Sequence, residues 1–126
     1  MIVMSPKLES LLKELKKTNS ETFFHSLRTK KYVCEMIMYL NSIGITDYDN
    51  DMIDCICKGA MLHDVGKLNV KNVILTKDSR LSDEEKEAIQ KHAYWSYELV
   101  KDELNDYEHD IIRDICRYHH ERIDGS

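Results

Sequence analysis

The stretch Gly59-Ala60-Met61-Leu62-His63-Asp64-Val65-Gly66-Lys67 decides how this chain is to be understood. An apolar run of helical character ends in adjacent His63 and Asp64, and Gly66 then permits a sharp turn before Lys67. An imidazole beside a carboxylate suits a divalent metal ion, and the two oxygens of Asp64 can bridge two ions. Lys67 would stand beside them as a positive charge for a phosphate. The stretch therefore predicts a metal site that handles a phosphoester.

The composition around this stretch predicts an all-α protein. The 126 residues include one proline and four glycines, 33% of them are charged, and apolar residues recur at helical spacing. This length suffices for a single domain with its own hydrophobic core. We therefore expect one helical domain over residues 1–126, in which residues 1–18 form an accessory amphipathic helix.

Charge and cysteine usage restrict the function further. The net charge of −5 argues against a DNA-binding surface but permits a small anionic substrate, because local cations can outweigh the overall sign. No apolar run reaches membrane-spanning length, and the first residues lack the basic flank of a signal peptide, so a cytoplasmic location is expected. The four cysteines lack Cys-x-x-Cys spacing and lie in apolar runs, which predicts reduced, buried thiols: Cys34, Cys55, Cys57 and Cys116.

Caps and periodicity predict the remaining helices. One runs over about 21–42 with Gly44 as its stop, and the next follows a polar turn and ends at His63-Asp64. A helical turn is expected over 70–75. The capping box of Ser82 and Glu85 opens a helix to about residue 102, and a last helix starts near residue 108. The helix over 21–42 is expected to bury Phe24, Leu27, Val33, Ile37 and Leu40.

Several other histidines are candidates for the same site. His25 follows Glu21 by one helical turn, so the pair could hold one ion or form a solvated pair at a helix start. His92 lies in the middle of a predicted helix, and His119-His120 end the last one. Six nitrogen or oxygen donors bridged by Asp64 suffice for a two-metal site. Arg28 is expected on the surface unless it points to this region, and His109 is expected to be an exposed bystander.

The order of these motifs resembles the HD-GYP group of the HD superfamily of metal-dependent phosphohydrolases. The resemblance covers roughly residues 20–126, and its joint set of motifs is highly specific. It rests on four segments in family order: His25-Ser26-Leu27-Arg28, His63-Asp64-Val65-Gly66-Lys67, Lys91-His92-Ala93 and His119-His120-Glu121-Arg122-Ile123-Asp124-Gly125-Ser126.

The resemblance implies an HD-domain helical bundle that hydrolyses cyclic di-GMP, or a related cyclic dinucleotide, by a metal-bridging hydroxide. Two or three divalent ions are expected, with Fe or Mn favoured and Mg, Ni or Zn as alternatives. Asp64 would bridge, Lys67 would hold a phosphate, and Glu21 matches the additional carboxylate of three-metal members. Carried over by position, the metal ligands are His25, His63, Asp64, His92, His119 and His120.

The sequence also departs from the family pattern. Ala93 replaces the usual proline, and the chain stops at Ser126, before the Gly-Tyr-Pro triplet and a further metal-binding Asp. The expected bundle therefore lacks the family's C-terminal helices, and a homodimer or a domain swap could cover the apolar surface left behind. Two alternatives follow: a non-catalytic metal-binding or signalling module, and an HD phosphohydrolase for another nucleotide.

Overall fold

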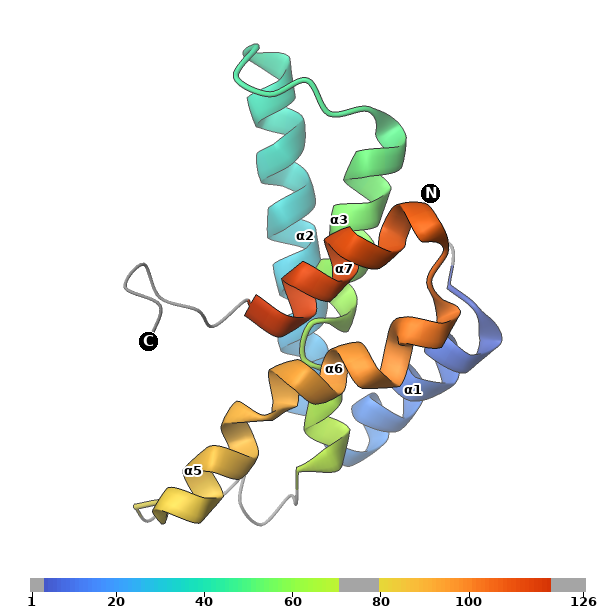
Figure 1. Cartoon of the computed structure of the whole chain (residues 1–126). Coiled ribbons are helices and arrows are strands. Elements are labelled where there is room, and N and C mark those ends of the chain that lie inside the picture. Colours follow the sequence, from blue (N-terminus) through green and yellow to red (C-terminus); the bar gives the residue numbers. More distant parts are fainter. Residues whose placement is uncertain (1–3, 71–79, 119–126) are drawn as a thin grey trace.

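The protein is described by a computed structural model that places residues 4–70 and 80–118. Within these ranges every regular element is a helix, which confirms the predicted all-α class (Figure 1). The predicted turn over 70–75 falls almost wholly outside the described residues, as do His119 and His120. The elements are α1 (Pro6–Thr18), α2 (Ser20–Ser42), α3 (Asn50–Leu62), η1 (Val65–Asn69), α5 (Asp83–Gln90), α6 (His92–Val100), η2 (Lys101–Glu103) and α7 (Asp106–Tyr118).

Local side-chain caps explain where most of these helices begin. The Asp49 carboxylate accepts from the Met52 N–H at 2.8 Å and starts α3. At α5 the predicted capping box is present: Ser82 Oγ accepts from the Glu85 N–H at 3.1 Å, and Glu85 Oε1 accepts from the Ser82 N–H at 2.9 Å. These hydrogen bonds satisfy donors that have no partner inside a helix.

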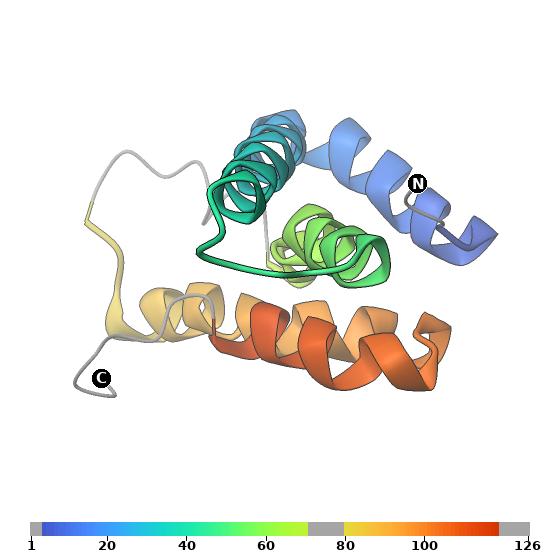
Figure 2. The ribbon, with the colours of Figure 1, turned by 90° about the horizontal axis from the view of Figure 1, so that it is seen from above.

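The helices form three layers with α3 in the middle. Seen from above, α1 and α2 lie on one side of α3, and α6 and α7 lie on the other (Figure 2). The hydrophobic core joins these layers and contains Leu8, Leu12, Cys55, Met61, Leu62, Val65, Val100, Ile112 and Cys116. Because α3 is enclosed on both sides, its C-terminal end delivers His63 and Asp64 into the interior. None of the helices placed by the structure is long and apolar enough to cross a membrane.

The single helix predicted from Ser82 to about residue 102 is wrong, because it breaks at Lys91. α5 ends at Gln90 and α6 begins at His92, without a proline or glycine at the junction. His92 Nδ1 contacts the carbonyl oxygen of Ile89, and Ser96 Oγ donates to the His92 carbonyl at 2.8 Å. Side-chain bonds of this kind compete with the helical ladder. The break thus coincides with a histidine that turns inward.

The predicted apolar face of α2 is also partly wrong. Ile37 is buried as expected, whereas Phe24 and Leu27 are 42% and 41% exposed. The small side chains of Thr22 and Ser26 are buried instead. Close approach of α2 to its neighbours favours small residues at the contact, and this packing requirement does not follow from the spacing of large apolar residues.

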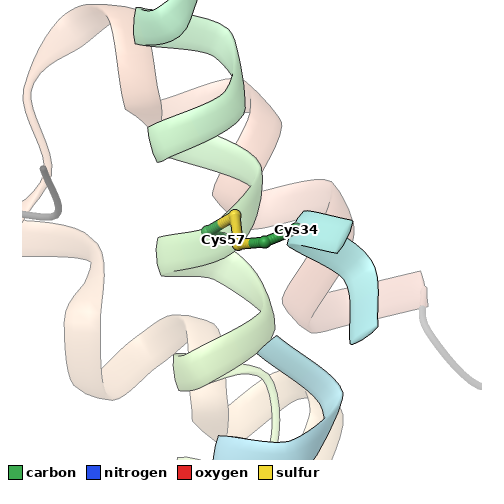
Figure 3. Close-up of a disulfide and its surroundings, with 2 residues drawn as sticks. All are labelled: Cys34 and Cys57. Atoms are coloured by element: carbon green, nitrogen blue, oxygen red, sulfur yellow. A yellow bond between two sulfur atoms is a disulfide. The ribbon is translucent and has the colours of Figure 1, made fainter. Parts of the chain in front are cut away.

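The prediction that all four cysteines are reduced is corrected for one pair. Cys34 of α2 and Cys57 of α3 form a disulfide, with their Cα atoms 6.0 Å apart (Figure 3). Their distance in sequence gave no sign of this, because the pairing depends on how α2 and α3 pack. Cys55 and Cys116 are buried and outside this disulfide, as predicted, and burial raises their pKa values to about 11 and about 12.

Candidate metal centre

The candidate centre is built around Asp64, the residue between the end of α3 and the start of η1. Its side chain is 4% exposed, and histidines from three helices approach it. His63 Nε2 lies 3.2 Å from Asp64 Oδ2, and His25 Nε2 of α2 lies 3.7 Å from the same oxygen. His92 Nε2 at the start of α6 lies 3.0 Å from Oδ1. Candidate donor atoms of His25, His63 and Asp64 all lie within 4.8 Å of one another.

The second ring nitrogens of His63 and His92 determine what Nε2 can do. His63 Nδ1 lies 2.5 Å from the carbonyl oxygen of Ala60, and His92 Nδ1 makes the equivalent contact with Ile89. A carbonyl only accepts, so each Nδ1 carries the proton of the bond. In the neutral ring Nε2 then has a lone pair, and this lone pair faces a carboxylate oxygen. Two acceptors this close need a cation between them, and such backbone bonds also orient metal-binding histidines.

The same carboxylate separates the histidines into two groups. His25 and His63 face Oδ2, whereas His92 faces Oδ1. This is the arrangement that a bridging carboxylate needs, with one oxygen directed to each side. The donor set of imidazole nitrogen and carboxylate oxygen fits a borderline or hard divalent ion such as Mn, Fe or Zn. The described residues therefore fit the metal that the sequence predicts.

Electrostatics at His63 show how strongly this site favours positive charge. Burial lowers the pKa of His63, but the hydrogen bond and the negative charge of Asp64 outweigh it, and the pKa is raised overall. A proton on Nε2 thus takes the place that a metal ion would take, so the two compete.

Lys67 lies on η1, three residues after Asp64. Its Nζ is 3.7 Å from Asp64 Oδ2, and its side chain is 22% exposed. The ammonium group therefore lies between the buried carboxylate and the solvent. From this position it can add positive charge to an anion that reaches the histidines from outside.

Gly66 and Ser96 hold the two halves of the centre together, and sequence reasoning missed Ser96. Gly66 N–H donates to Ser96 Oγ at 2.7 Å, and this buried hydroxyl donates to the His92 carbonyl. A Cβ on Gly66 would lie 2.0 Å from the His92 carbonyl oxygen. In the described residues only Gly44 has positive φ, so Gly66 serves close packing and not the sharp turn we expected. The available signal for Ser96 was its position one turn after His92.

The other residues considered from the sequence lie in different surroundings. Glu21 is exposed in the first turn of α2, and none of the contacts described at the centre includes it. Arg28 is exposed and lines a pocket on α2, and the histidine contacts described above do not include it. His109 is half-buried with its Nε2 2.8 Å from Tyr97 Oη, so it is less exposed than predicted. His119 and His120 lie beyond the described residues.

Comparison with known proteins identifies a matching domain family and several relatives of this chain. The HD domain family matches residues 22–126. A 3'3'-cGAMP-specific phosphodiesterase of Vibrio cholerae is 35% identical over 105 residues, covering 81% of this chain and 20% of the relative. A cyclic di-GMP phosphodiesterase of V. cholerae is 31% identical over 114 residues, covering 86% of this chain and 23% of the relative. A cyclic di-GMP phosphodiesterase of Pseudomonas aeruginosa is 27% identical over 126 residues, covering 99% of this chain and 28% of the relative. The chain thus spans about a fifth to a quarter of these relatives.

Proposed function

This chain belongs to the HD domain family, and from this premise we propose that it is a metal-dependent phosphodiesterase of the HD-GYP type. Its substrate would be cyclic di-GMP or a related cyclic dinucleotide, the class named in the relatives described above. One observation carries the proposal: imidazole nitrogens from three helices face both oxygens of a single buried carboxylate.

Asp64 is proposed to bridge two ions. His25 and His63 would serve the ion at Oδ2, and His92 would serve the ion at Oδ1. His119 and His120 are proposed to complete the coordination of the second ion, and Glu21 is proposed to bind a third ion. Fe or Mn is the proposed metal. When bound, such ions lower the pKa of a water and neutralise charge on the phosphate.

The residues themselves support substrate binding in three ways. The backbone contacts of His63 and His92 occupy Nδ1 of each ring, so Nε2 of each would be the atom offered to an ion. Burial of Asp64 excludes water from the carboxylate and strengthens every charge interaction around it. Lys67 would bind a non-bridging phosphate oxygen and stabilise charge that develops there.

A pocket lined mainly by residues of α5 and α6 is a candidate contact region for an extended substrate. It has a volume of about 390 Å³ and is lined by Glu87, Gln90, Lys91, Ala93, Tyr94 and Arg117. Lys91 and Ala93 flank His92 in sequence, but the histidines and the carboxylate of the centre are not among the residues that line this pocket. Tyr94 is 50% exposed and offers a ring on which a base can stack. Lys91 and Arg117 would favour the second phosphate of a cyclic dinucleotide.

The test is hydrolysis of cyclic di-GMP by the chain supplied with Mn²⁺ or Fe²⁺. We expect linear product from the wild type, loss of product with Asp64→Asn, and little change with His109→Gln, which alters a histidine that faces Tyr97. Metal binding without turnover of any cyclic dinucleotide would refute the enzyme and favour the non-catalytic module. Turnover of another nucleotide alone would favour the third hypothesis. The cytoplasmic location and the dimer stay predictions.

A further inference from the structure

The two cysteines of the disulfide differ sharply in their access to solvent. Cys57 lies within α3 and is 1% exposed, whereas Cys34 on α2 is half-buried. Figure 3 shows the bond joining α3 to α2. Cys34 is therefore the more accessible residue of the pair to a reagent that arrives from solvent.

A pocket with a mostly apolar surface and cationic residues among its lining opens at Cys34. It has a volume of about 420 Å³ and is lined by Leu27, Arg28, Lys30, Lys31, Cys34 and Glu35. Three of these side chains are cationic and one is anionic, although the whole chain carries a net charge of −5. Lys30 and Lys31 precede Cys34 by four and three residues, so they share its face of the helix. The pocket is thus a local positive site on an acidic protein.

We propose that Cys34 is a thiol–disulfide exchange site for small anionic thiols and disulfides, with Cys57 as its buried resolving partner. Nearby cations favour the thiolate of a cysteine and attract an anionic reagent. At Cys55 burial and the charge of Glu108 outweigh the nearby Lys58, and the pKa of this thiol is raised to about 11. The site thus distinguishes one cysteine among four.

The exchange proceeds in two balanced steps. A thiolate RS⁻ attacks Cys34 Sγ, the Cys34–Cys57 bond breaks, and Cys57 leaves as a thiolate that takes a proton from water. A second RS⁻ attacks the sulfur of R in the mixed disulfide, which releases Cys34 as a thiolate and forms RSSR. The protein disulfide gains two electrons and the two thiols lose them. In the reverse direction RSSR oxidises Cys34, and Cys57 then displaces RS⁻.

The bond has a consequence for the metal centre, and this part rests on the proposed function. α2 carries His25 and α3 carries His63 and Asp64. Along the helices, Cys34 lies about 14 Å from His25 and Cys57 about 9 Å from His63, at a rise of about 1.5 Å per residue. The crosslink therefore restrains how His25, the most exposed of the three histidines, is held over Asp64. We expect roughly tenfold weaker Mn²⁺ binding in the reduced chain.

The experiment treats the reduced full chain with oxidised glutathione, which is anionic, and with cystamine, which is cationic. Intact-mass and peptide analysis follow the products. We expect oxidised glutathione to react faster and to leave the wild type with an intramolecular disulfide. Cys57→Ser should accumulate one glutathione adduct on Cys34. Lys30→Gln with Lys31→Gln should reduce the preference for glutathione at least about threefold, whereas Lys7→Gln with Lys13→Gln, an equal charge loss on α1, should not.

Equal rates for the two reagents on the wild type would overturn the proposal, and this comparison needs no variant. So would adducts that form first on Cys55 or Cys116, or a preference that survives loss of both lysines. Equal Mn²⁺ affinity in the oxidised and reduced chains would remove only the link to the metal centre. Failure to hydrolyse cyclic di-GMP would leave the exchange site untouched.

Discussion

Replacing Gly66 by alanine tests how the candidate centre is assembled. The added Cβ would lie 2.0 Å from the His92 carbonyl oxygen, 2.4 Å from the Ser96 nitrogen and 2.7 Å from Ser96 Oγ. Two of these atoms belong to the backbone, so α6 must move away from η1. Overpacking of this kind costs about 1–3 kcal/mol, and loss of the Gly66–Ser96 hydrogen bond adds about 1 kcal/mol. We expect Gly66→Ala to lower the free energy of unfolding by about 2–4 kcal/mol.

Two assays separate this effect from a general loss of stability. Thermal unfolding should show a melting temperature lower by about 8–15 °C, and calorimetric titration should show weaker Mn²⁺ binding, because His92 moves away from Asp64. Gly59→Ala is the matched control. Its Cβ would meet the movable tip of Ile115 at 2.6 Å, within a helix that favours alanine. If Gly66→Ala melts and binds Mn²⁺ like Gly59→Ala, the close contact between η1 and α6 does not position His92.

Three further predictions concern stability and pH. Lys58→Met should cost about 3 kcal/mol in urea unfolding, because the half-buried Glu108 carboxylate, 2.9 Å from Lys58 Nζ, loses its cationic partner. Adding Glu108→Leu should recover most of that loss. Cys34→Ser should lower the free energy of unfolding by about 3 kcal/mol relative to the oxidised wild type, because the disulfide closes a loop between residues 23 apart and so reduces the entropy of the unfolded chain. The variant should be as stable as the reduced wild type. Because the pKa of His63 is raised, a proton should compete with Mn²⁺ for this histidine, and Mn²⁺ affinity should fall as pH falls from about 8 to about 6. The control variant His109→Gln should show the same pH dependence, and an affinity that does not change with pH would contradict the prediction.

Local chemistry allowed much of the fold to be predicted. The capping box of Ser82 and Glu85 involves residues three apart, so its hydrogen bonds follow from the sequence alone. The end of α3 at His63-Asp64 was likewise predictable, since an apolar run stops there. The meeting of distant residues in one site was predictable only from the order of the motifs. That order led us to expect His25 and His92 close to Asp64.

Contacts between helices account for what the sequence did not predict. The Cys34–Cys57 bond depends on the alignment of α2 with α3, and cysteine spacing carries no information about that alignment. The same holds for Ser96, whose hydroxyl contacts Gly66 across 30 residues. The exposure of Phe24 belongs to this group, because α2 approaches its neighbours through small side chains. Periodicity predicts that a helix has a buried face, but the packing partner decides which residues form it.

The burial of Asp64 connects the fold to the proposed chemistry. A carboxylate on a side chain that is only 4% exposed is unfavourable unless nearby groups supply positive charge. The three-layer fold brings His25, His63 and His92 to this carboxylate, and Lys67 adds a permanent cation. A proton on His63 or metal ions between the histidines can meet the same need, and only the ions also activate water. The interior that α3 occupies therefore favours metal loading, because a bound ion would neutralise Asp64 in place of that proton.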